Sequence, residues 1–320
     1  MTDLSAATEA LPIQVPLDGA LWAAVVTFHR PTELAAMLAA IQRQTKQADH
    51  LLVVDNGSDA SVRVVAAKAG ADYIDPGDNL GPAGGVATAM EYMLERAADE
   101  DWLLLLDDDN PPEATDAFEA IWRFGHQQKL EKPSTGGVGS QGGFYDPRLG
   151  IWHRPEDADL VGPVRVDVTG GGYLPLYRCD VIRKVGTFDR TLFFGFEEGE
   201  YGQRLRSRGY SMWADGDRWL AERTAAGELG VKASQTKTSY KKAAWRRYYG
   251  IRNATIIAWR YGKPWTPFLV SVGGALLGVR ALMKARRPIR ELLLPVRGAV
   301  DGLLRRGGRT VDPGLNLKEG

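Results

Sequence analysis

Three consecutive aspartates, Asp107, Asp108 and Asp109, are the residues of this chain best suited to chemistry. Adjacent carboxylates repel one another, so keeping all three ionised needs a compensating cation. Carboxylate oxygens suit Mg²⁺ or Mn²⁺, and Mg²⁺ is commonly bound through one or two carboxylates together with substrate phosphates. The alternative is a solvated acidic turn that caps the next helix. Because the triplet directly follows the apolar run at residues 102–106, we favour the metal site.

Two further polar clusters also stand at the ends of apolar runs. Thr27 and Arg30 lie at the end of the run at residues 22–28, and Asp55 directly follows the run at residues 51–54. In an open parallel sheet, ligands bind in the crevice beyond the carboxyl ends of the strands. We therefore expect these side chains to gather with the aspartate triplet at one edge of a sheet, although turn chemistry alone would explain each cluster.

A second acidic cluster, formed by Glu197, Glu198 and Glu200, lies in the second half of the chain. Glu200 is followed four residues later by Arg204, a spacing that pairs opposite charges on one helix face, so a charged helix start would explain part of the cluster. Upstream, the run of glycines at residues 170–172 would let the backbone approach a ligand closely. A plain turn accounts for these glycines equally well.

The elements that must position these residues alternate along the first third of the chain. Apolar, β-favouring runs predict strands at residues 22–28, 51–54, 71–74 and 102–106. Helices are predicted between them, from Pro31 and at about residues 62–69 and 83–97. Strands that are apolar throughout and separated by helices favour a parallel sheet covered on both faces. The predicted class is α/β with a mostly parallel central sheet, and the Gly- and Pro-rich segment 133–175 adds loops with short strands.

The composition excludes several classes of protein. Of the 320 residues, 44% are hydrophobic and 25% are charged, which excludes a mostly disordered chain and a polytopic membrane protein. A single cysteine, Cys179, can form neither an internal disulfide nor a cysteine-rich zinc module. Residues 1–19 show neither periodicity nor the apolar core of a signal peptide, so we expect a flexible lead-in and a cytosolic protein.

The charge is distributed unevenly, although 40 Lys and Arg balance 40 Asp and Glu. Residues 1–231 hold 21 basic and 36 acidic residues, a balance of −15, whereas residues 232–310 hold 18 basic and 2 acidic residues, a balance of +16. This polarity predicts that the tail meets an anionic partner. The alternative is that the acidic residues of 1–231 pair with the basic residues of 232–310 within the same chain. Nucleic acid is the weaker partner, because no nucleic-acid-binding pattern accompanies the charge.

The basic tail also contains apolar segments. Residues 240–261 predict a helix with aromatic and basic residues, and residues 265–279 form an apolar run. Since that run has 15 residues and a spanning helix needs about 20, we do not predict a transmembrane segment. With the basic residues at 280–290 and the Leu-rich residues 291–304, the tail fits a segment lying in the interface of an anionic membrane. A helical tail that packs on the sheet or forms a dimer contact is the alternative.

Six sequence motifs, in this order and spacing, resemble family 2 of the inverting glycosyltransferases, which have the GT-A fold. The motifs are WAAVVTFHRP, LLVVDNGSD, NLGPAGG, LLLLDDDN, VTGGGYLPLYRCDVIRKVGTFDRTLFFGFEEGEYGQRLRSRGY at residues 168–210, and WRRYYGIRN at residues 245–253. The resemblance covers roughly residues 20–262 and is greatest to the rhamnosyl- and galactofuranosyl-transferase-like branch, whose members work on surface polysaccharides. It implies a GT-A-type, Rossmann-like fold.

The resemblance also implies a role for each cluster described above. The donor-binding residues would be Thr27, Arg30, Asp55, Asn79, Gly81 and Asp108. The metal, Mg²⁺ or Mn²⁺, would be held by Asp107 and Asp109. The residues near the sugar or the acceptor would be Gly171, Gly172 and Glu197.

The motif FEEGEYGQR implies the catalytic base. In the family, the residue after the first Glu of this motif takes that role and is usually Asp, whereas here it is Glu198, which is one methylene longer. Many relatives also supply a histidine metal ligand further along the chain, but no histidine follows His153. Glu222 is a candidate oxygen substitute, and water with diphosphate oxygens would also complete the shell of Mg²⁺.

The implied enzyme is a metal-dependent glycosyltransferase. It would move a sugar, with inversion, from a UDP or dTDP sugar to a hydroxyl of a glycan or polyprenyl-linked acceptor in cell-surface polysaccharide synthesis. Residues 20–235 would form the catalytic domain and residues 236–320 a helical, basic extension. Contact between this extension and anionic lipid would place the protein in the cytoplasm, peripherally on the inner face of the cell membrane. The sequence leaves the oligomeric state open.

Two other functions are consistent with acidic groups at strand ends. A sugar nucleotidyltransferase would need a Gly-rich basic loop after the first strand, and TFHRPTE at residues 27–33 offers none. A catalytically inactive, nucleotide-sugar-binding scaffold protein would explain both the absent histidine and the Glu in place of Asp. A dinucleotide-dependent dehydrogenase is disfavoured, because no GxGxxG follows the first strand.

Overall fold

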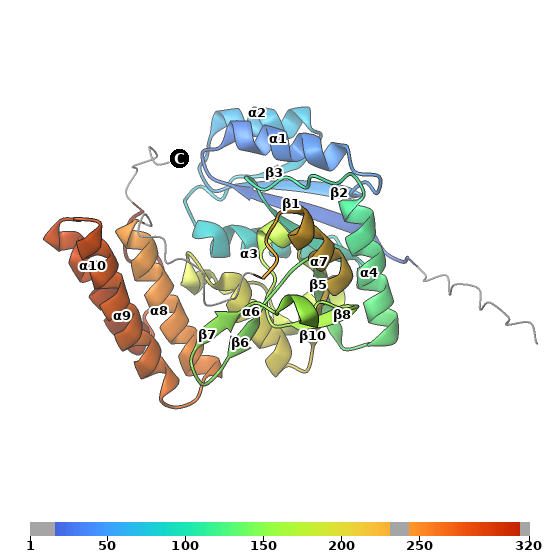
Figure 1. Ribbon diagram of the computed structural model, residues 1–320. Coiled ribbons are helices and arrows are strands. Elements are labelled where there is room, and N and C mark those ends of the chain that lie inside the picture. Colours follow the sequence, from blue (N-terminus) through green and yellow to red (C-terminus); the bar gives the residue numbers. More distant parts are fainter. Residues whose placement is uncertain (1–16, 231–242, 314–320) are drawn as a thin grey trace, which may run out of the picture.

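The computed structural model describes residues 17–230 and 243–313, and an eight-stranded sheet organises the first of these segments (Figure 1). The strand order is β3-β2-β1-β4-β9-β5-β10-β8. The strands of this sheet are β1 (Leu21–Thr27), β2 (His50–Asp55), β3 (Asp72–Ile74), β4 (Trp102–Asp107), β5 (Thr135–Gly139), β8 (Pro163–Val166), β9 (Leu176–Arg178) and β10 (Ser211–Asp215). Two short strands, β6 (Phe144–Asp146) and β7 (Ile151–His153), pair separately. The predicted α/β class with a mostly parallel central sheet is confirmed.

Helices cover both faces of this sheet, because successive strand residues point to opposite sides and nearly all are apolar. Leu21, Ala23 and Val25 pack with α1 (Pro31–Gln42), α2 (Ala60–Lys68) and α4 (Ala117–Glu131). Trp22 and Ala24 pack on the other side, in a cluster with residues of α3 (Gly81–Leu94), α5 (Cys179–Val185), α6 (Glu197–Ser207) and α7 (Gly216–Ala225). The two apolar clusters hold the strands rigidly and leave the carboxyl edge of the sheet for polar side chains.

The observed elements follow the sequence expectation closely, except for the antiparallel strand β9. The first strand and the first three helices begin within two residues of their predicted starts. Within the segment 133–175, expected to hold loops and short strands, the structure has four strands and the short 3-10 helices η1 (Asp157–Asp159) and η2 (Gly171–Tyr173). Just after it, β9 inserts between β4 and β5 and is antiparallel to both. Such non-local pairing leaves no periodic pattern in the sequence.

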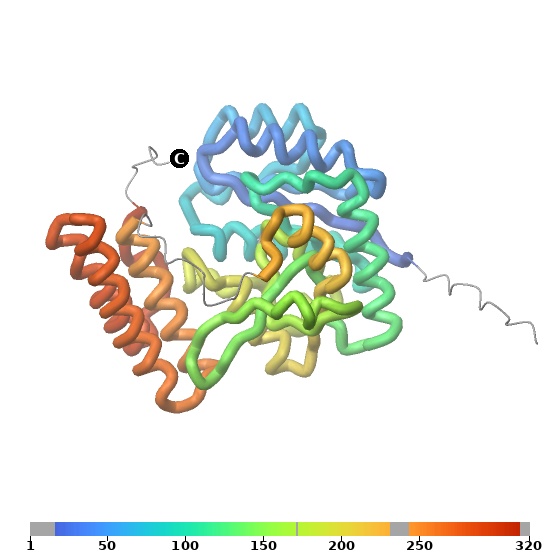
Figure 2. Tube along the Cα trace, in the orientation of Figure 1, coloured from blue at the N-terminus to red at the C-terminus, as the bar shows by residue number. Residues whose placement is uncertain are grey.

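Three long helices form the C-terminal part of the described chain, beside the sheet domain (Figure 2). They are α8 (Ala244–Tyr261), α9 (Thr266–Lys284) and α10 (Ile289–Leu303), and each packs on the other two. The apolar run expected to be too short to span a bilayer belongs to α9, which has 19 residues. By length and composition α9 could cross a membrane, but a third of its apolar window is buried in the protein.

Two of the predicted domain limits fall outside the described residues. The lead-in at residues 1–19 is described only from residue 17, and the boundary between residues 235 and 236 lies in the gap before residue 243. The helical extension itself is observed, from residue 244 onward.

Candidate active site

The three polar clusters that follow β1, β2 and β4 lie at one edge of the sheet. β1 lies between β2 and β4, so the ends of the three strands are neighbours. Thr27 is in register with Asp55 on one side, and Val26 is in register with Asp107 on the other. The sheet therefore brings the polar ends of these strands together, as the sequence analysis expected.

Thr27 and Arg30 hold the second and third aspartates of the triplet. The Thr27 hydroxyl donates a hydrogen bond of 2.6 Å to Oδ2 of Asp108. Arg30 donates from Nη1 to Asp108 at 3.1 Å and to Asp109 at 2.6 Å. Asp108 is buried, whereas 53% of the Asp109 side chain is exposed. A single guanidinium thus neutralises part of the triplet and orients two of its carboxylates.

Asp107 lies in a different environment from its two neighbours. It ends β4 with its side chain at the surface, and no hydrogen bond or ion pair to it is found among the described residues. Protein atoms around the carboxylate exclude part of the water, and the charges of Asp109 and Asp108 are close, so the pKa of Asp107 rises to about 6, although the charge of Arg30 opposes this rise. A carboxylate with a raised pKa and no cationic partner of its own in the described chain is suited to a cation from solution.

Glu197 brings the second acidic cluster to the same place. It is the first residue of α6, its side chain is 95% buried, and its Oε2 has no hydrogen-bond partner in the described structure. Burial and then the charge of Glu198 raise the pKa of Glu197 well above its ordinary value, and the charge of Asp107 adds to this effect. Two acidic motifs from separate halves of the chain therefore share one electrostatic environment.

Glu198 faces the glycine-rich turn that contains η2. Its Oε1 lies 3.8 Å from the point where a Cβ on Gly170 would stand. The turn is tied to the residue after the aspartate triplet, because Asn110 donates from Nδ2 to the carbonyl of Gly172 at 2.8 Å. A Cβ on Gly172 would lie 2.7 Å from the same nitrogen, so a close approach explains this glycine better than a plain turn does. Gly171 opens η2 between these two contacts.

Asp55 and Asn79, both expected to bind the donor, hold their own turns in this structure. Asp55 is fully buried, and its two oxygens accept from the backbone amides of Gly57 and Asp59 and from the hydroxyl of Tyr73. Burial and the neighbouring carboxylate raise the pKa of Tyr73 to about 12, so the hydroxyl stays a donor. Asn79 accepts from the amide of Gly81 at 2.9 Å. Their contacts to a nucleotide stay a prediction.

The backbone conformation and a close contact with the Phe193 carbonyl explain why residue 81 is a glycine. Its φ is +68°, and an added Cβ would lie 2.1 Å from the carbonyl oxygen of Phe193. The carbonyl of Gly81 accepts from Asn56 Nδ2 at 3.0 Å, and the other side-chain atom of Asn56, Oδ1, has no partner in the described chain. Gly81 thus joins the start of α3 to the end of β2 and to the loop that precedes α6.

Glu200 is a structural residue, as the alternative reading of the acidic cluster expected. Its buried carboxylate pairs with Arg204 at 2.9 Å and with Arg260 at 3.2 Å, and it accepts from the hydroxyl of Tyr261 at 2.9 Å. These contacts join α6 to α8. They explain Glu200 as a structural residue, and the role of Glu198 as the base stays a prediction.

Glu222 is engaged elsewhere. It lies on α7, where its oxygens accept from Gln141 at 3.1 Å and from Arg218 at 3.4 Å. Within residues 17–230 and 243–313, no three His, Cys, Asp or Glu side chains are placed to hold a metal by themselves. An ion held by Asp107 and the exposed Asp109 would need further oxygens, such as those of a bound diphosphate, which is the manner typical of Mg²⁺.

Two functional candidates that sequence reasoning left without a role are Arg252 and Asn253, in the motif WRRYYGIRN. Asn253 Nδ2 lies within 3.0 Å of the carbonyls of Leu192, Phe194 and Gly195, in the loop just before Glu197. Arg252 donates to the carbonyl of Leu192 at 2.7 Å and to Oδ1 of Asn253 at 2.9 Å. The only hint in the sequence was a polar Arg-Asn pair inside a helix rich in aromatic residues. In the structure both side chains are fully buried.

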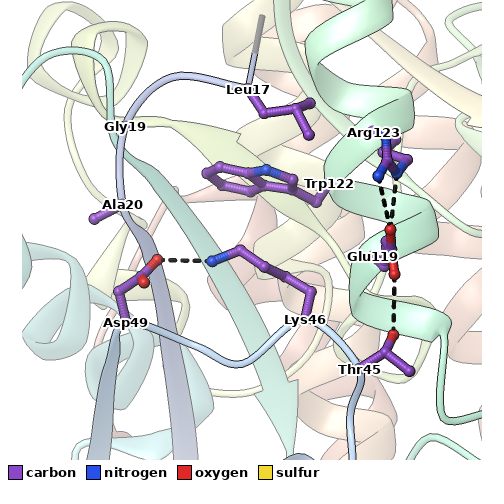
Figure 3. Close-up of a pocket in the computed structure, with 9 residues that line it drawn as sticks. All are labelled: Leu17, Gly19, Ala20, Thr45, Lys46, Asp49, Glu119, Trp122 and Arg123. Carbon is purple, nitrogen blue, oxygen red and sulfur yellow. Dashed lines mark hydrogen bonds and ion pairs between the residues drawn. The ribbon is translucent and has the colours of Figure 1, made fainter. Parts of the chain in front are cut away.

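Two cavities of the described structure lie away from the acidic edge. One of about 540 Å³ lies at the amino ends of β1 and β2, near Trp122 and the ion pairs of Lys46 with Asp49 and of Glu119 with Arg123 (Figure 3). Another, of about 580 Å³, surrounds the paired charges of Glu200 and Arg260. In both, these charges are paired, so neither resembles a site for a charged donor.

Parts of the chain are similar to proteins named as glycosyltransferases. Residues 22–160 match the family model described as glycosyl transferase family 2. A galactofuranosyltransferase, GlfT1 of Mycolicibacterium smegmatis, is 33% identical over 200 residues, which cover 57% of this chain and 64% of that protein. The Mycobacterium tuberculosis protein of the same name is 30% identical over 199 residues, covering 58% and 64%. The chain therefore spans less than two thirds of the length of these curated relatives.

Two solved structures share the fold. One is the mannosyltransferase PcManGT from Pyrobaculum calidifontis in complex with GDP-Man and Mn²⁺, with a TM-score of 0.55 and 14% identity over 93% of this chain and 92% of that one. The other is GalNAc-T7 with UDP, GalNAc and Mn²⁺, with a TM-score of 0.56 and 9% identity over 90% and 58%. At such identities the likeness concerns the fold, and it confirms the expected GT-A type.

Proposed function

We propose that the chain is a member of glycosyl transferase family 2, whose model matches residues 22–160, and that it transfers a sugar from a UDP or dTDP sugar to a hydroxyl of a glycan or polyprenyl-linked acceptor. We infer inversion at the anomeric carbon and a role in building cell-surface polysaccharide. The curated relatives, named as galactofuranosyltransferases, support this reading and make a galactofuranosyl donor the first to test.

One observation carries the proposal. Glu197 is buried, and the charges of both Glu198 and Asp107 raise its pKa, which supports a shared site for the acidic motif at the end of β4 and the acidic motif at the start of α6. A glycosyl donor has two ends, a diphosphate and a sugar. A site with a cation-binding carboxylate on one side and a base on the other matches both ends.

The donor end of the proposed site is formed by β1, β2 and β4. Arg30 and Thr27 hold Asp108, which we assign to the ribose. Asp55 holds the turn after β2, where the nucleotide base would bind. Asp107 and Asp109 would hold Mg²⁺ or Mn²⁺, which when bound offsets the charge that develops on the departing diphosphate. Both structural neighbours were solved with Mn²⁺, which supports a divalent ion here.

The acceptor end is formed by the start of α6 and the glycine turn. Glu198 would take the proton from the incoming hydroxyl as that oxygen forms the new glycosidic bond, while the bond from the sugar to the diphosphate breaks. The extra methylene of Glu relative to Asp moves the carboxylate outward. A Cβ on Gly170 would stand 3.8 Å from Oε1 of Glu198, so the missing side chain at this position would leave room for the longer carboxylate.

The test is a donor screen of the full chain with Mn²⁺. UDP-galactofuranose, UDP-galactopyranose, UDP-glucose and dTDP-rhamnose would each be offered with a galactosyl or rhamnosyl glycoside, and release of the free nucleotide would be measured. We expect acceptor-dependent release of UDP or dTDP with one donor. Thermal stabilisation by a donor without any release would favour the inactive scaffold, and diphosphate release from a nucleoside triphosphate would favour the nucleotidyltransferase.

A further inference from the structure

The outer faces of α9 and α10 are apolar and exposed. On α9, Phe268, Val272 and Leu276 recur at helical spacing, and on α10 Leu293, Val296 and Val300 do the same. All six are exposed, Leu276 by 68%. We call the exposed large apolar side chains of residues 265–304 the apolar face. They are 12 of the 19 exposed large apolar side chains in the described chain, which concentrates them in one part of the molecule.

The inner faces of the same helices carry small residues. A Cβ on Gly274 would lie 3.1 Å from Ile251 of α8, and one on Gly278 would lie 2.8 Å from Pro295 of α10. On α10, Gly298 approaches the backbone of Tyr248 so closely that a Cβ would stand 2.6 Å from its carbonyl oxygen. A bundle in water places its large apolar side chains inside. Small residues inside and large apolar residues outside are the pattern of helices that pack among lipids.

Cations border the apolar face. Arg280 lies near the end of α9, Arg286 lies in the turn after it, and Arg290 is the second residue of α10. All three are exposed, and none forms an ion pair with another described residue. Their positive charge complements anionic lipid headgroups. A second copy of this chain docked through the same face would instead bring like charges together.

The geometry favours helices that lie on a bilayer over a helix that crosses it. α9 is long and apolar enough to cross. However, α10 packs against α9 and carries Arg290, Glu291, Arg297 and Asp301, which crossing would draw into the hydrocarbon layer. A helix that lies in the interface buries one apolar face and leaves its opposite face for protein.

We propose that α9 and α10 dock on an anionic lipid bilayer, with the apolar face at the boundary between headgroups and acyl chains and with Arg280, Arg286 and Arg290 among the headgroups. The cytoplasmic leaflet is the anionic one, so this docking places the protein peripherally on the inner face of the cell membrane. The proposal stands apart from the sugar-transfer reaction, since binding to lipid needs no donor.

The test is flotation of the full chain with vesicles of phosphatidylglycerol and phosphatidylcholine, compared with vesicles of phosphatidylcholine alone. The face variant is Leu276→Gln/Leu293→Gln/Val296→Gln. The matched control is Val64→Gln/Leu130→Gln/Val161→Gln, which alters three equally exposed apolar side chains on the sheet domain. We expect the wild type and the control to float with the anionic vesicles, and the face variant to partition at least about tenfold less.

The charge contribution is tested separately. Arg280→Gln/Arg286→Gln/Arg290→Gln should lose most of the preference for anionic over neutral vesicles and most of the dependence on salt. Wild-type protein that stays at the bottom with anionic vesicles, or a face variant that floats like the control, would overturn the proposal. So would a wild-type dimer, measured by light scattering, that the face variant converts to a monomer without any vesicle binding in the wild type.

Discussion

At the scale of single residues, Glu198 and Asp107 divide the proposed reaction between them, although one begins a helix and the other ends a strand. Asp108 accepts from both Thr27 and Arg30, and Glu200 pairs with two arginines, so the hydrogen-bonding capacity of these two carboxylates is largely used within the protein. Asp109 accepts from Arg30, but 53% of its side chain is exposed. Asp107 has no such partner in the described chain. This difference distinguishes Asp107 from its neighbours in the proposed mechanism, although the three aspartates look alike in the sequence.

The first prediction concerns the base. Glu198→Gln should lower kcat by about 10²–10⁴, because the amide cannot take the acceptor proton, and should leave the Kd of the donor within about twofold. Rates of nucleotide release and donor titration calorimetry measure the two quantities. Glu228→Gln, at an exposed site after α7, is the matched control and should behave as wild type. Near-wild-type turnover of Glu198→Gln would remove this residue from the mechanism.

The second prediction concerns pH. Asp107 has a pKa of about 6, so it is ionised above pH 6 and protonated below, and a proton competes with a cation for its oxygens. Mn²⁺-dependent binding of UDP should therefore weaken as pH falls from 7 to 5, by up to about tenfold for each unit below 6. Calorimetry across this range measures it.

The Asp107→Asn variant provides the reference for the pH experiment, because UDP has its own titrating phosphate. This variant should bind Mn²⁺ and UDP weakly at every pH, and its remaining pH dependence belongs to the ligand. If wild type and variant showed the same pH profile, Asp107 would not be a metal ligand.

At the scale of elements, the loop before α6 depends on α8. Phe193 and Phe196 both have positive φ, 58° and 69°, which costs free energy for residues with a side chain. The buried amide of Asn253 bonds three carbonyls of this loop and so maintains a conformation that its own residues disfavour. We therefore propose Asn253 as a positioning residue for Glu198, and the next prediction tests this role.

The third prediction follows from this contact. Asn253→Ala should lower kcat by about 10–100-fold, because misplacement of a reacting group by about 1 Å has an effect of this size, while the donor KM stays nearly unchanged. Thr255→Ala is the control on the same helix, since the buried Thr255 hydroxyl bonds only to its own helix backbone. Equal loss of activity in both variants would mean that α8 acts through general stability alone.

The fourth prediction concerns the start of α3. Gly77 and Gly81 both have positive φ, but a Cβ on Gly77 would meet nothing within 4 Å, whereas one on Gly81 would collide with the backbone of Phe193. Gly77→Ala should lower the free energy of unfolding by about 1–2 kcal/mol through backbone strain alone. Gly81→Ala should lower it by at least about 1 kcal/mol more, measured by urea denaturation. Equal losses would show that the Phe193 loop yields to the methyl group.

The sequence allowed the parallel half of the fold to be predicted, because each of its strands and helices carries a local pattern. The apolar run 102–106 and the Asp that follows it are such a pattern, and β4 ends at Asp107 as they indicate. The antiparallel β9 was beyond prediction, because its pairing depends on residues far away in the chain. The same holds for Asn253, whose three bonds reach a loop about sixty residues earlier.

At the scale of the whole molecule, the charge asymmetry of the sequence is not explained by pairing between an acidic body and a basic arm alone. Arg260 pairs with Asp189 and Glu200, and Arg309 pairs with Asp78, so a few arm residues do bond to the sheet domain. Arg280 and Arg290 form no ion pair with another described residue. The positive charge of these two arginines therefore stays available at the surface.

The fifth prediction concerns removal of the extension. Tyr248 and Arg252 of α8 are fully buried, and Asp301 and the carbonyl of Gly308 are their partners at 2.7 and 2.6 Å. A chain ending at residue 263 would lose these partners and expose α8, so its Tm should fall by about 5–10 °C or more, measured by calorimetry. The face variant described above should keep its Tm within about 2 °C. A truncated chain as stable as wild type would mean that α8 does not need α9 and α10.

The position of α8, with Asn253 against the loop before Glu198 on one side and α9 and α10 on the other, has a kinetic consequence. With α9 and α10 docked on lipid, α8 would determine both the distance and the orientation of the proposed active site relative to the bilayer. An acceptor anchored in that bilayer would then be encountered by lateral diffusion in two dimensions instead of three, at a fixed distance from its anchor. The length of the acceptor between its lipid anchor and the site would then determine which of its hydroxyls is glycosylated.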